Sequence, residues 1–349
     1  MLDNEGQDNI IAALKHHDRI IRIYFHHYLL EPFSAVTRKP FPVLTEIDLT
    51  SSDKIVPVLH EEFLGGPVPH LREIILLNIA FPAFPKFALS CSSLSEVTLW
   101  FIPSAGYLSP EAMATCLATF PSLEYLDIQL QYSESRPDRI GLPPPIRSVL
   151  PALHRFNLQG VGEYLEDLVA LIDTPELRWL RIGGDMFNID VPQLHKLIVR
   201  SQRFGSLNPA EIIFSPSATE IILGLPSCAV NLQIVCRETN WRTSSMVQVC
   251  SQLSPLLSHV EQLYIHGRAP GRGQGRQLNG TDPTEILELF VLFPSVRRLH
   301  IFGELRPFVA RALQELKGES AAEVLPSLRG LVFRVSSPSG SIQKDIQGF

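Results

Sequence analysis

The sequence lacks most of the features that mark an enzyme, a membrane protein or a secreted protein. It has no uninterrupted apolar run of about 18 residues, the length of a membrane span. Its first residues, MLDNEGQDN, are not a basic and then apolar leader. The motifs G-x-S-x-G, H-E-x-x-H and G-x-x-x-x-G-K-S/T are absent as well. We therefore expect no catalytic residues, no cofactor and no membrane association, and a location in the cytoplasm or the nucleus.

Positive charge and cysteine are also scarce. The formal net charge is -6, which argues against the basic face of a nucleic-acid-binding protein. The five cysteines are scattered and never form a C-x-x-C pair, so we predict reduced thiols and neither a disulfide framework nor a zinc site. The histidines near the start of the chain lack the spacing of metal ligands, so no metal site is expected. The cysteines are Cys91, Cys116, Cys228, Cys236 and Cys250.

What the sequence does contain is a repeated pattern that begins with proline. The pattern P-x-Φ-x-x-Φ-x-Φ, in which Φ is apolar, follows ten of the 28 prolines. Chance would give about two to three matches. One copy is FPSLEYLDI, with Pro121, Leu123, Leu126 and Ile128. The ten prolines are Pro42, Pro69, Pro82, Pro121, Pro151, Pro175, Pro192, Pro216, Pro294 and Pro326.

The first apolar residue of each copy is its anchor, position a. Three segments, CSSLSEVTL, LSHVEQLYI and DRIIRIYF, fit without a proline. Most intervals between anchors are 23 to 36 residues long, so the period is loose but persistent. The anchors are Ile20, Leu44, Leu71, Leu94, Leu123, Leu153, Leu177, Leu194, Val260, Val296 and Leu328.

Between several anchors the apolar residues have the spacing of an amphipathic helix. Met113, Cys116, Leu117 and Phe120 are one such set, and Ser109-Pro110 before them is a helix-start signal. Each repeat is therefore a helix, a proline-marked turn and a short strand. The strand pattern L-x-x-L-x-L is the signature of leucine-rich repeats. We predict an α/β fold, a leucine-rich-repeat-like solenoid or horseshoe with a parallel concave sheet, outer helices and irregular repeats. The alternative is an ordinary α/β domain with a doubly wound sheet.

The pattern predicts one domain. The solenoid is expected to cover residues 1–336, with an irregular insert at about 203–256. In that insert the segments EIIF, TEIIL and VNLQIVC read as short strands that would form hairpins rather than a regular repeat. Residues 337–349 are predicted to be a disordered tail.

Several segments resemble the leucine-rich-repeat regions of fungal F-box-like proteins. They include DNIIAALKHHDRI, FLGGPVPHLREI, SLSEVTLWFIPSAGYLSPEAMATCLATFPSLEYLDI and GVGEYLEDLVALIDTPEL. In that family an F-box docks onto the Skp-type adaptor of a cullin ubiquitin ligase, and the repeats present a protein substrate. The resemblance therefore implies a surface for substrate recognition.

The F-box itself is missing from the sequence. A stretch of the type L-P-x-E-I-L-x-x-I-F does not precede Ile10, and the nearest match is DPTEILELF, Asp282 to Phe290. That match lies between an Arg/Gly loop and a repeat strand, so we interpret it as a helix of the solenoid. A Skp-type adaptor is expected as a partner only if an F-box is present or supplied. Two further functions stay open: a free-standing repeat scaffold without a ubiquitin role, and an α/β hydrolase-like enzyme.

The strand pattern also predicts a binding face. Positions a, a+3 and a+5 point into the core, and positions a+2, a+4 and a+6 point to the open side of the sheet, where equivalent positions form columns. At a+6, Trp100 is predicted to lie opposite Gln129. Aromatic and arginine anchors dominate protein interfaces. The predicted partner-binding residues are Tyr24, Glu46, Asp48, Glu73, Glu96, Trp100, Tyr125, Asp127, Arg155, Trp179 and Arg181.

Simpler interpretations remain open for these residues. The acids would also keep a sheet solvated, and the tryptophans would also pack on adjacent loops. The proline-rich segment Gln131–Ser148 is expected to project as a loop. The Arg/Gly segment Gly267–Gly280 would suit phosphate or RNA, but without an aromatic residue it is better interpreted as a flexible linker. A protein partner is therefore expected, and nucleic acid is not.

Overall fold

In the computed structural model the described residues form two compact units, which we treat separately. Unit 1 contains the described residues up to Gly184 together with Pro192–Gly205, and unit 2 contains those from Leu207 onward. The predicted tail at 337–349 lies outside the described residues, so the extent of a single solenoid over 1–336 stays a prediction. The structure describes residues 9, 11–26, 38–52, 56–130, 147–160, 162–184, 192–205, 207–215, 217–235, 242–267, 283–315 and 324–334.

The sheet of unit 1 is parallel throughout its described strands. Each strand pairs with the next along the chain, in the order β1-β2-β3-β4-β5-β7-β9. Parallel neighbours need a crossover connection, and here the helices supply several of these connections. The strands are β1 (Arg22–His26), β2 (Glu46–Thr50), β3 (Glu73–Leu77), β4 (Glu96–Ile102), β5 (Tyr125–Leu130), β7 (Arg155–Gln159) and β9 (Trp179–Gly184).

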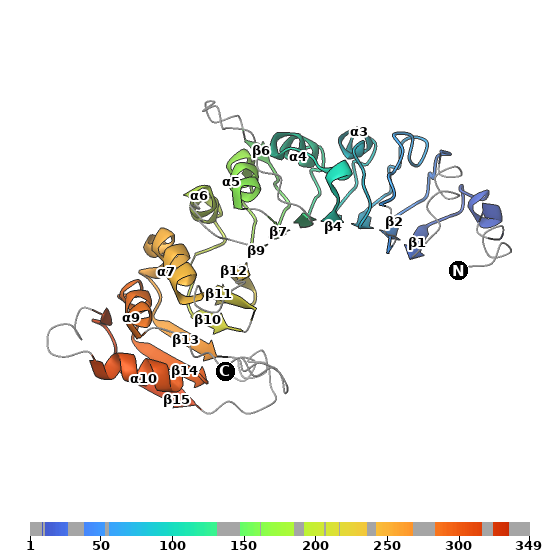
Figure 1. The fold of residues 1–349 in the computed structure, drawn as a ribbon. Helices are drawn as coiled ribbons and strands as arrows, with labels where there is room; N and C mark the ends of the chain where they lie inside the picture. Colours follow the sequence, from blue (N-terminus) through green and yellow to red (C-terminus); the bar gives the residue numbers. More distant parts are fainter. Residues whose placement is uncertain are drawn as a thin grey trace. The chain divides into compact units, whose positions relative to one another are not determined.

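The helices of unit 1 cover one face of this sheet. α3, α4 and α5 lie on the same side of the strands (Figure 1), and each packs against the next, as does α5 against α6. The predicted helix start at Ser109 is confirmed, because the Ser109 hydroxyl accepts a hydrogen bond from Ala112 N at 3.2 Å. The helices are α3 (Phe84–Ala88), α4 (Pro110–Leu117), α5 (Gly162–Leu171) and α6 (Pro192–Arg200). Unit 1 also contains a short 3-10 turn η1 (Ser104–Gly106) and a two-stranded pair, β6 (Ser148–Val149) and β8 (Ile172–Asp173).

The core lies between the sheet and these helices. The anchor Leu123 just before β5 and the residues Leu126 and Ile128 within it are at most 1% exposed, as the positions a, a+3 and a+5 require. Leu117 and Phe120, from α4 and the residues after it, are buried to the same degree. The predicted inward set is thus confirmed for this repeat.

Nine of the eleven anchors follow the same tight turn. The anchor N–H donates to the carbonyl three residues earlier, as Leu123 does to Phe120 at 3.2 Å. In seven of nine such turns the second residue is the proline of the pattern, the position where its fixed φ is favoured. The proline therefore shapes the turn into the strand. The nine anchors are Leu44, Leu71, Leu94, Leu123, Leu153, Leu177, Val260, Val296 and Leu328.

A second repeated contact joins each strand to the one before it. The carbonyl at position a+1 accepts two N–H groups from the next repeat, as Ser95 O does from Glu124 N at 2.8 Å and Tyr125 N at 3.0 Å. The paired donors sit where the next strand begins, so this contact sets the register. The carbonyls that do this belong to Ile21, Thr45, Arg72, Ser95, Glu124, His154, Glu261 and Arg297.

Unit 2 begins with antiparallel strands. β10, β11 and β12 pair as two consecutive antiparallel neighbours, which confirms the predicted hairpins of the insert. β10 then pairs in parallel with β13, and β14 and β15 follow in parallel, so the protein is a mixed α/β fold with a mostly parallel arrangement of strands. The strands are β10 (Ala210–Phe214), β11 (Ala218–Leu225), β12 (Cys228–Val235), β13 (Gln262–Gly267), β14 (Arg298–Gly303) and β15 (Gly330–Arg334).

In the part of unit 2 that the structure describes, four helices accompany the strands. α7 packs against α8 and α9, and α9 packs against α10. The apolar residues Met246 and Val249 of α7 and Leu289 of α9 are at most 2% exposed, as their helical spacing predicts. The helices are α7 (Arg242–Gln252), α8 (Ser254–Leu257), α9 (Pro283–Val291) and α10 (Arg306–Glu315).

At β13 a side chain replaces the repeated carbonyl. Here the two N–H donors, Glu261 N and Gln262 N, both reach Asn208 Oδ1 at 3.2 Å. The antiparallel insert has interrupted the repeat, and Asn208 supplies the acceptor that an a+1 carbonyl supplies elsewhere. The contact spans more than 50 residues of sequence.

We expect Asn208→Ala to destabilise unit 2 by about 1.5 kcal/mol, because it leaves two half-buried N–H groups without their acceptor. Asn208→Asp keeps an oxygen at this position and is expected to cost less than half as much. Urea denaturation of the two variants and the wild type measures the difference. Equal destabilisation by alanine and aspartate would contradict the role assigned to the Asn208 oxygen.

One predicted strand is wrong. The segment VPQLHKLIV, with anchor Leu194, matches the proline pattern but forms helix α6. Leu194, Leu197 and Ile198 are at most 1% exposed, and their spacing of i, i+3 and i+4 is also that of a helix face. The match at Pro82 likewise leads into helix α3. The pattern L-x-x-L alone does not separate a strand from a helix.

Candidate functional site

The open face of unit 1 brings the predicted residues together. The strand registers place Glu46, Glu73 and Glu96 side by side on β2, β3 and β4, and the same row continues to Tyr125, Arg155 and Trp179. The next row joins Tyr24 to Asp48, and further along Asp127 to Asn157 and Arg181. These two columns are as predicted. The binding role of their members stays a prediction.

The column at position a+6 is interrupted by a bulge in β4, so the prediction that Trp100 lies opposite Gln129 is wrong. Leu99 pairs with Ile128, but Ile102 pairs with Leu130, so β4 carries one extra residue. Phe101 takes a left-handed conformation at this bulge, with φ of 52°. Trp100 therefore lies beside Leu77 of β3 and is not in register with Gln129. A bulge redirects side chains, and Trp100 is left 36% exposed on the open face.

A groove of about 550 Å³ lies on this face. It crosses five neighbouring strands, β2, β3, β4, β5 and β7, or the residues just before them. Six of the predicted binding residues line it: Asp48, Glu73, Glu96, Trp100, Tyr125 and Arg155. Thr50, Ile75, Leu77, Thr98, Glu124 and His154 complete the lining. The predicted residues outside the groove lining are Tyr24, Glu46, Asp127, Trp179 and Arg181.

Glu46, at the β1 edge of the row formed by Glu46, Glu73 and Glu96, has polar partners on the neighbouring strand. Arg22 Nε lies 3.1 Å from Glu46 Oε1, and the Tyr24 hydroxyl donates a hydrogen bond to the same carboxylate. This bond is the main reason that the pKa of Tyr24 is raised. His26 Nε2 lies 4.0 Å from Asp48. The charge of Glu46 is therefore partly compensated by Arg22.

Glu73 has no such compensation. Burial raises the pKa of the Glu73 carboxyl above its usual range, and the nearby carboxylates of Glu96, Glu46 and Asp48 raise it further. Arg22 opposes this shift, but only as the last of the causes. Among the described residues no cation lies within 4.0 Å of Glu73 or Glu96. Negative charge is thus concentrated where β3 and β4 begin.

A hydrogen-bonded cluster holds the β5 end of the site. The Tyr125 hydroxyl donates to Asp127 Oδ2 at 3.0 Å, and Asn157 Nδ2 lies 3.0 Å from the same oxygen and 3.2 Å from the Tyr125 hydroxyl. Burial raises the pKa of Tyr125 to about 12, with a smaller contribution from Asp127. Asp127, only 8% exposed, is therefore a structural carboxylate that orients Tyr125.

Unit 2 carries stacked aromatic residues that are not among the predicted binding residues. The rings of Tyr264 and His300 are stacked with centroids 4.6 Å apart, and those of His266 and Phe302 at 4.3 Å. Arg334 Cζ lies 6.0 Å from the centre of the Phe302 ring. Burial lowers the pKa of His300, and Arg334 and Arg298 lower it further. Applying the a+4 and a+6 rule to the anchors Val260, Val296 and Leu328 would have found these side chains.

The nearest match to an F-box is a packed helix. Most of Asp282 to Phe290 forms α9, in which Ile286, Leu289 and Phe290 are at most 4% exposed. These apolar side chains are thus buried in the core of unit 2, as expected for a helix of the repeat. The Arg/Gly segment after Gly267 and most of the proline-rich segment Gln131–Ser148 lie outside the described residues.

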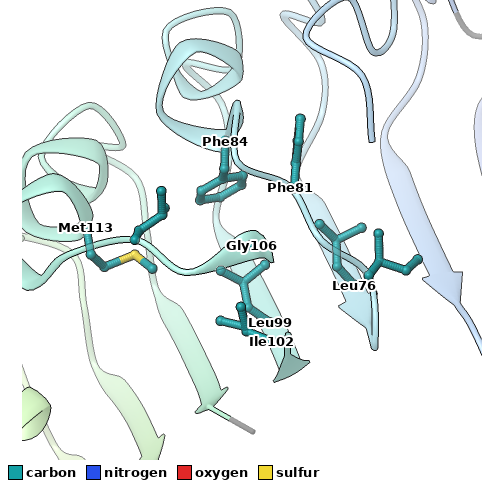
Figure 2. A pocket seen from close by; sticks show the side chains of 9 residues that line it. Leu76, Phe81, Phe84, Leu99, Ile102, Gly106 and Met113 are labelled. Atoms are coloured by element: carbon teal, nitrogen blue, oxygen red, sulfur yellow. The ribbon is translucent and has the colours of Figure 1, made fainter. Parts of the chain in front are cut away.

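A second, much smaller cavity lies in the core of unit 1. Figure 2 shows apolar side chains of β3, β4 and the helix layer around a cavity of about 20 Å³, among them Leu76, Phe84, Leu99 and Met113. Its lining has no polar side chain. We interpret it as a packing gap. Within the described ranges no group of His, Cys, Asp and Glu is arranged to hold a metal ion, and no helix there is long and apolar enough to cross a membrane.

Comparison with known proteins gave no relative: no family model matches the sequence, and no curated protein does.

Proposed function

We propose that the protein is a leucine-rich-repeat-like solenoid that acts as a non-catalytic protein-interaction module. Three features support the fold proposal. The parallel strands of unit 1 follow one another in chain order, its helices lie on one side, and the turn and carbonyl contacts recur from repeat to repeat. Such arrays bury their apolar faces by stacking neighbours and leave a broad sheet face open.

The observation that carries the functional proposal is the groove on that open face. It is wide, it is lined by residues of five strands or the turns before them, and it combines an exposed tryptophan with charged side chains of both signs. Interfaces between proteins rely on a few aromatic and arginine anchors within a polar rim. In this proposal Trp100 and Tyr125 are the anchors, and the charged residues fix the orientation of the partner.

The resemblance to F-box-like proteins extends the proposal to a biological role. It supports the substrate-recognition part of a ubiquitin-ligase adaptor, and the missing F-box favours a free-standing scaffold as the alternative. A location in the cytoplasm or nucleus belongs to the same proposal. It is supported by Cys91, Cys116 and Cys250, which are buried and unpaired, as in a reducing compartment. Burial raises the pKa of Cys91 and Cys116 to about 12, so these thiols are unreactive core residues.

The test compares proteins retained by three forms of the chain from a fungal lysate. Trp100→Ala removes the exposed anchor in the groove, and Leu89→Ala removes an apolar side chain, 75% exposed, that follows helix α3 on the other layer. We expect a partner that wild type and Leu89→Ala retain and that Trp100→Ala loses. With the purified partner, Trp100→Ala should weaken binding about 30-fold, or about 2 kcal/mol.

The outcomes separate the alternatives. Retention of a Skp-type adaptor and a cullin together with a Trp100-dependent partner supports the ligase role. A Trp100-dependent partner without them supports the free-standing scaffold. If Trp100→Ala and Leu89→Ala retain the same proteins as wild type, the groove is not the binding surface and the proposal is wrong.

A further inference from the structure

The groove of unit 1 has two chemically different sides. Its acidic side lies where the strands begin and holds Glu73, Glu96 and Glu124. Its apolar side lies further along the same strands, where Leu77 and Trp100 face each other across β3 and β4. A ligand that crosses the strands would meet carboxylates along one edge and apolar surface along the other.

The charge of the groove is unbalanced. Four carboxylates line it, against one arginine and one histidine, and both of these lie at the β7 end. The crowding of Glu73 by Glu96, Glu46 and Asp48 shows in its raised pKa. A positive charge bound between these carboxylates would relieve their mutual repulsion.

We infer that the groove binds an extended protein segment in which lysine or arginine alternates with apolar residues, and that the segment lies across the strands. In an extended chain alternate side chains point to opposite edges, which matches an acidic edge and an apolar edge. The aliphatic stem of a lysine would lie on Ile75 while its ammonium group reaches Glu73 or Glu96. Trp100 offers an exposed ring to a cation or an apolar side chain.

This inference rests on the proposed function, because it assumes that the open face is the binding surface. It adds the chemistry of the partner. The acids are thereby assigned to recognition and not merely to keeping the sheet solvated. The assignment also predicts that the affinity falls as salt concentration rises, since the contacts are between exposed charges.

The experiment uses a fluorescent eight-residue peptide in which lysine alternates with valine, titrated with the full-length protein. Twin peptides replace every lysine by glutamine or by glutamate. Glu73→Gln and Glu96→Gln remove one carboxylate each from the groove. Glu163→Gln is the matched control, because Glu163 is an exposed residue of helix α5 on the other layer and the change in net charge is the same.

We expect the lysine peptide to bind and each groove variant to weaken it about fivefold, while Glu163→Gln has no effect. Binding should also weaken as the pH falls through the raised pKa of Glu73, because protonation removes the charge that the peptide contacts. The groups that face Glu73 are Glu46 and Asp48 from β2, Glu96 from β4 and Arg22 from β1. In Glu73→Gln this part of the pH dependence should be reduced.

Three results would overturn the inference: equal binding of the glutamine twin, tighter binding of the glutamate twin, or equal affinity for the polyamine spermine, which has charge but no side chains. Failure here is distinguishable from failure of the proposed function. If the lysine peptide does not bind but a partner still depends on Trp100, the groove is an interface for a partner of other chemistry. If no partner depends on Trp100, the interface itself is refuted.

Discussion

Replacing Leu126 by aspartate is expected to unfold unit 1. Leu126 is fully buried near the start of β5, where it pairs with Val97 of β4 on one side and Phe156 of β7 on the other. Removing a buried leucine alone costs about 2–5 kcal/mol. Burying an unpaired carboxylate adds several kcal/mol more. The sum, about 5 kcal/mol or more, is comparable to the whole stability of a typical domain.

The expected result is a loss of the cooperative unfolding transition of unit 1, measured by circular dichroism during urea denaturation. Gln129→Asp is the matched control. It places the same carboxylate on the same strand but on the open face, where Gln129 is half-buried, and it should change the free energy of unfolding by less than about 1 kcal/mol. If Leu126→Asp unfolds at the same urea concentration as Gln129→Asp, the row of buried residues through β4, β5 and β7 is not a continuous core.

Much of unit 1 could be predicted because its signals are local. The alternation in FPSLEYLDI defines which side chains of β5 face inward, and the same alternation in neighbouring repeats places equivalent residues in register. Aligning the anchors was therefore enough to predict that Glu46, Glu73 and Glu96 form a row. The proline of the pattern marks the turn because its φ suits the second turn position.

Other parts of the site depend on geometry that the pattern does not contain. One extra residue in β4 moves Trp100 out of register with β5, and nothing in SEVTLWFI marks that bulge. Glu124 and His154 precede their strands and were not counted among the outward positions, yet both line the groove. Both residues belong to the repeated carbonyl contact, in which Glu124 N donates to Ser95 O and His154 N donates to Glu124 O.

Helix α6 illustrates a different limit. Its sequence, PQLHKLIVR, satisfies the strand pattern and the helix pattern equally, so local preference does not decide between them. A contact from outside the segment favours the helix. Glu166 of α5 is only 5% exposed, and its carboxylate accepts hydrogen bonds from Gln193 N at 2.8 Å and Leu194 N at 3.1 Å. These are N–H groups of the first turn of α6, which have no partner within the helix.

Glu166→Ala is therefore expected to destabilise unit 1 by about 3 kcal/mol. It removes a charged acceptor from two N–H groups at a helix start, one of them on the buried Leu194, and it also removes a negative charge from the positive end of the helix dipole. Glu163→Ala changes an exposed glutamate of the same helix and should cost less than about 0.5 kcal/mol. Urea denaturation of both variants measures the difference.

Glu166→Gln separates the hydrogen bonds from simple filling of space. Glutamine has nearly the same volume as glutamate but offers one neutral acceptor oxygen in place of two charged ones, so Gln193 N and Leu194 N lose the separate carboxylate oxygens that they now contact. We expect it to fall between wild type and alanine, and amide hydrogen exchange at Leu194 should become faster in both variants. A glutamine variant as stable as wild type, with unchanged exchange at Leu194, would mean that the start of α6 is held by its apolar face alone. The helix would then be selected by packing of Leu194, Leu197 and Ile198, and the buried carboxylate would contribute nothing to that choice.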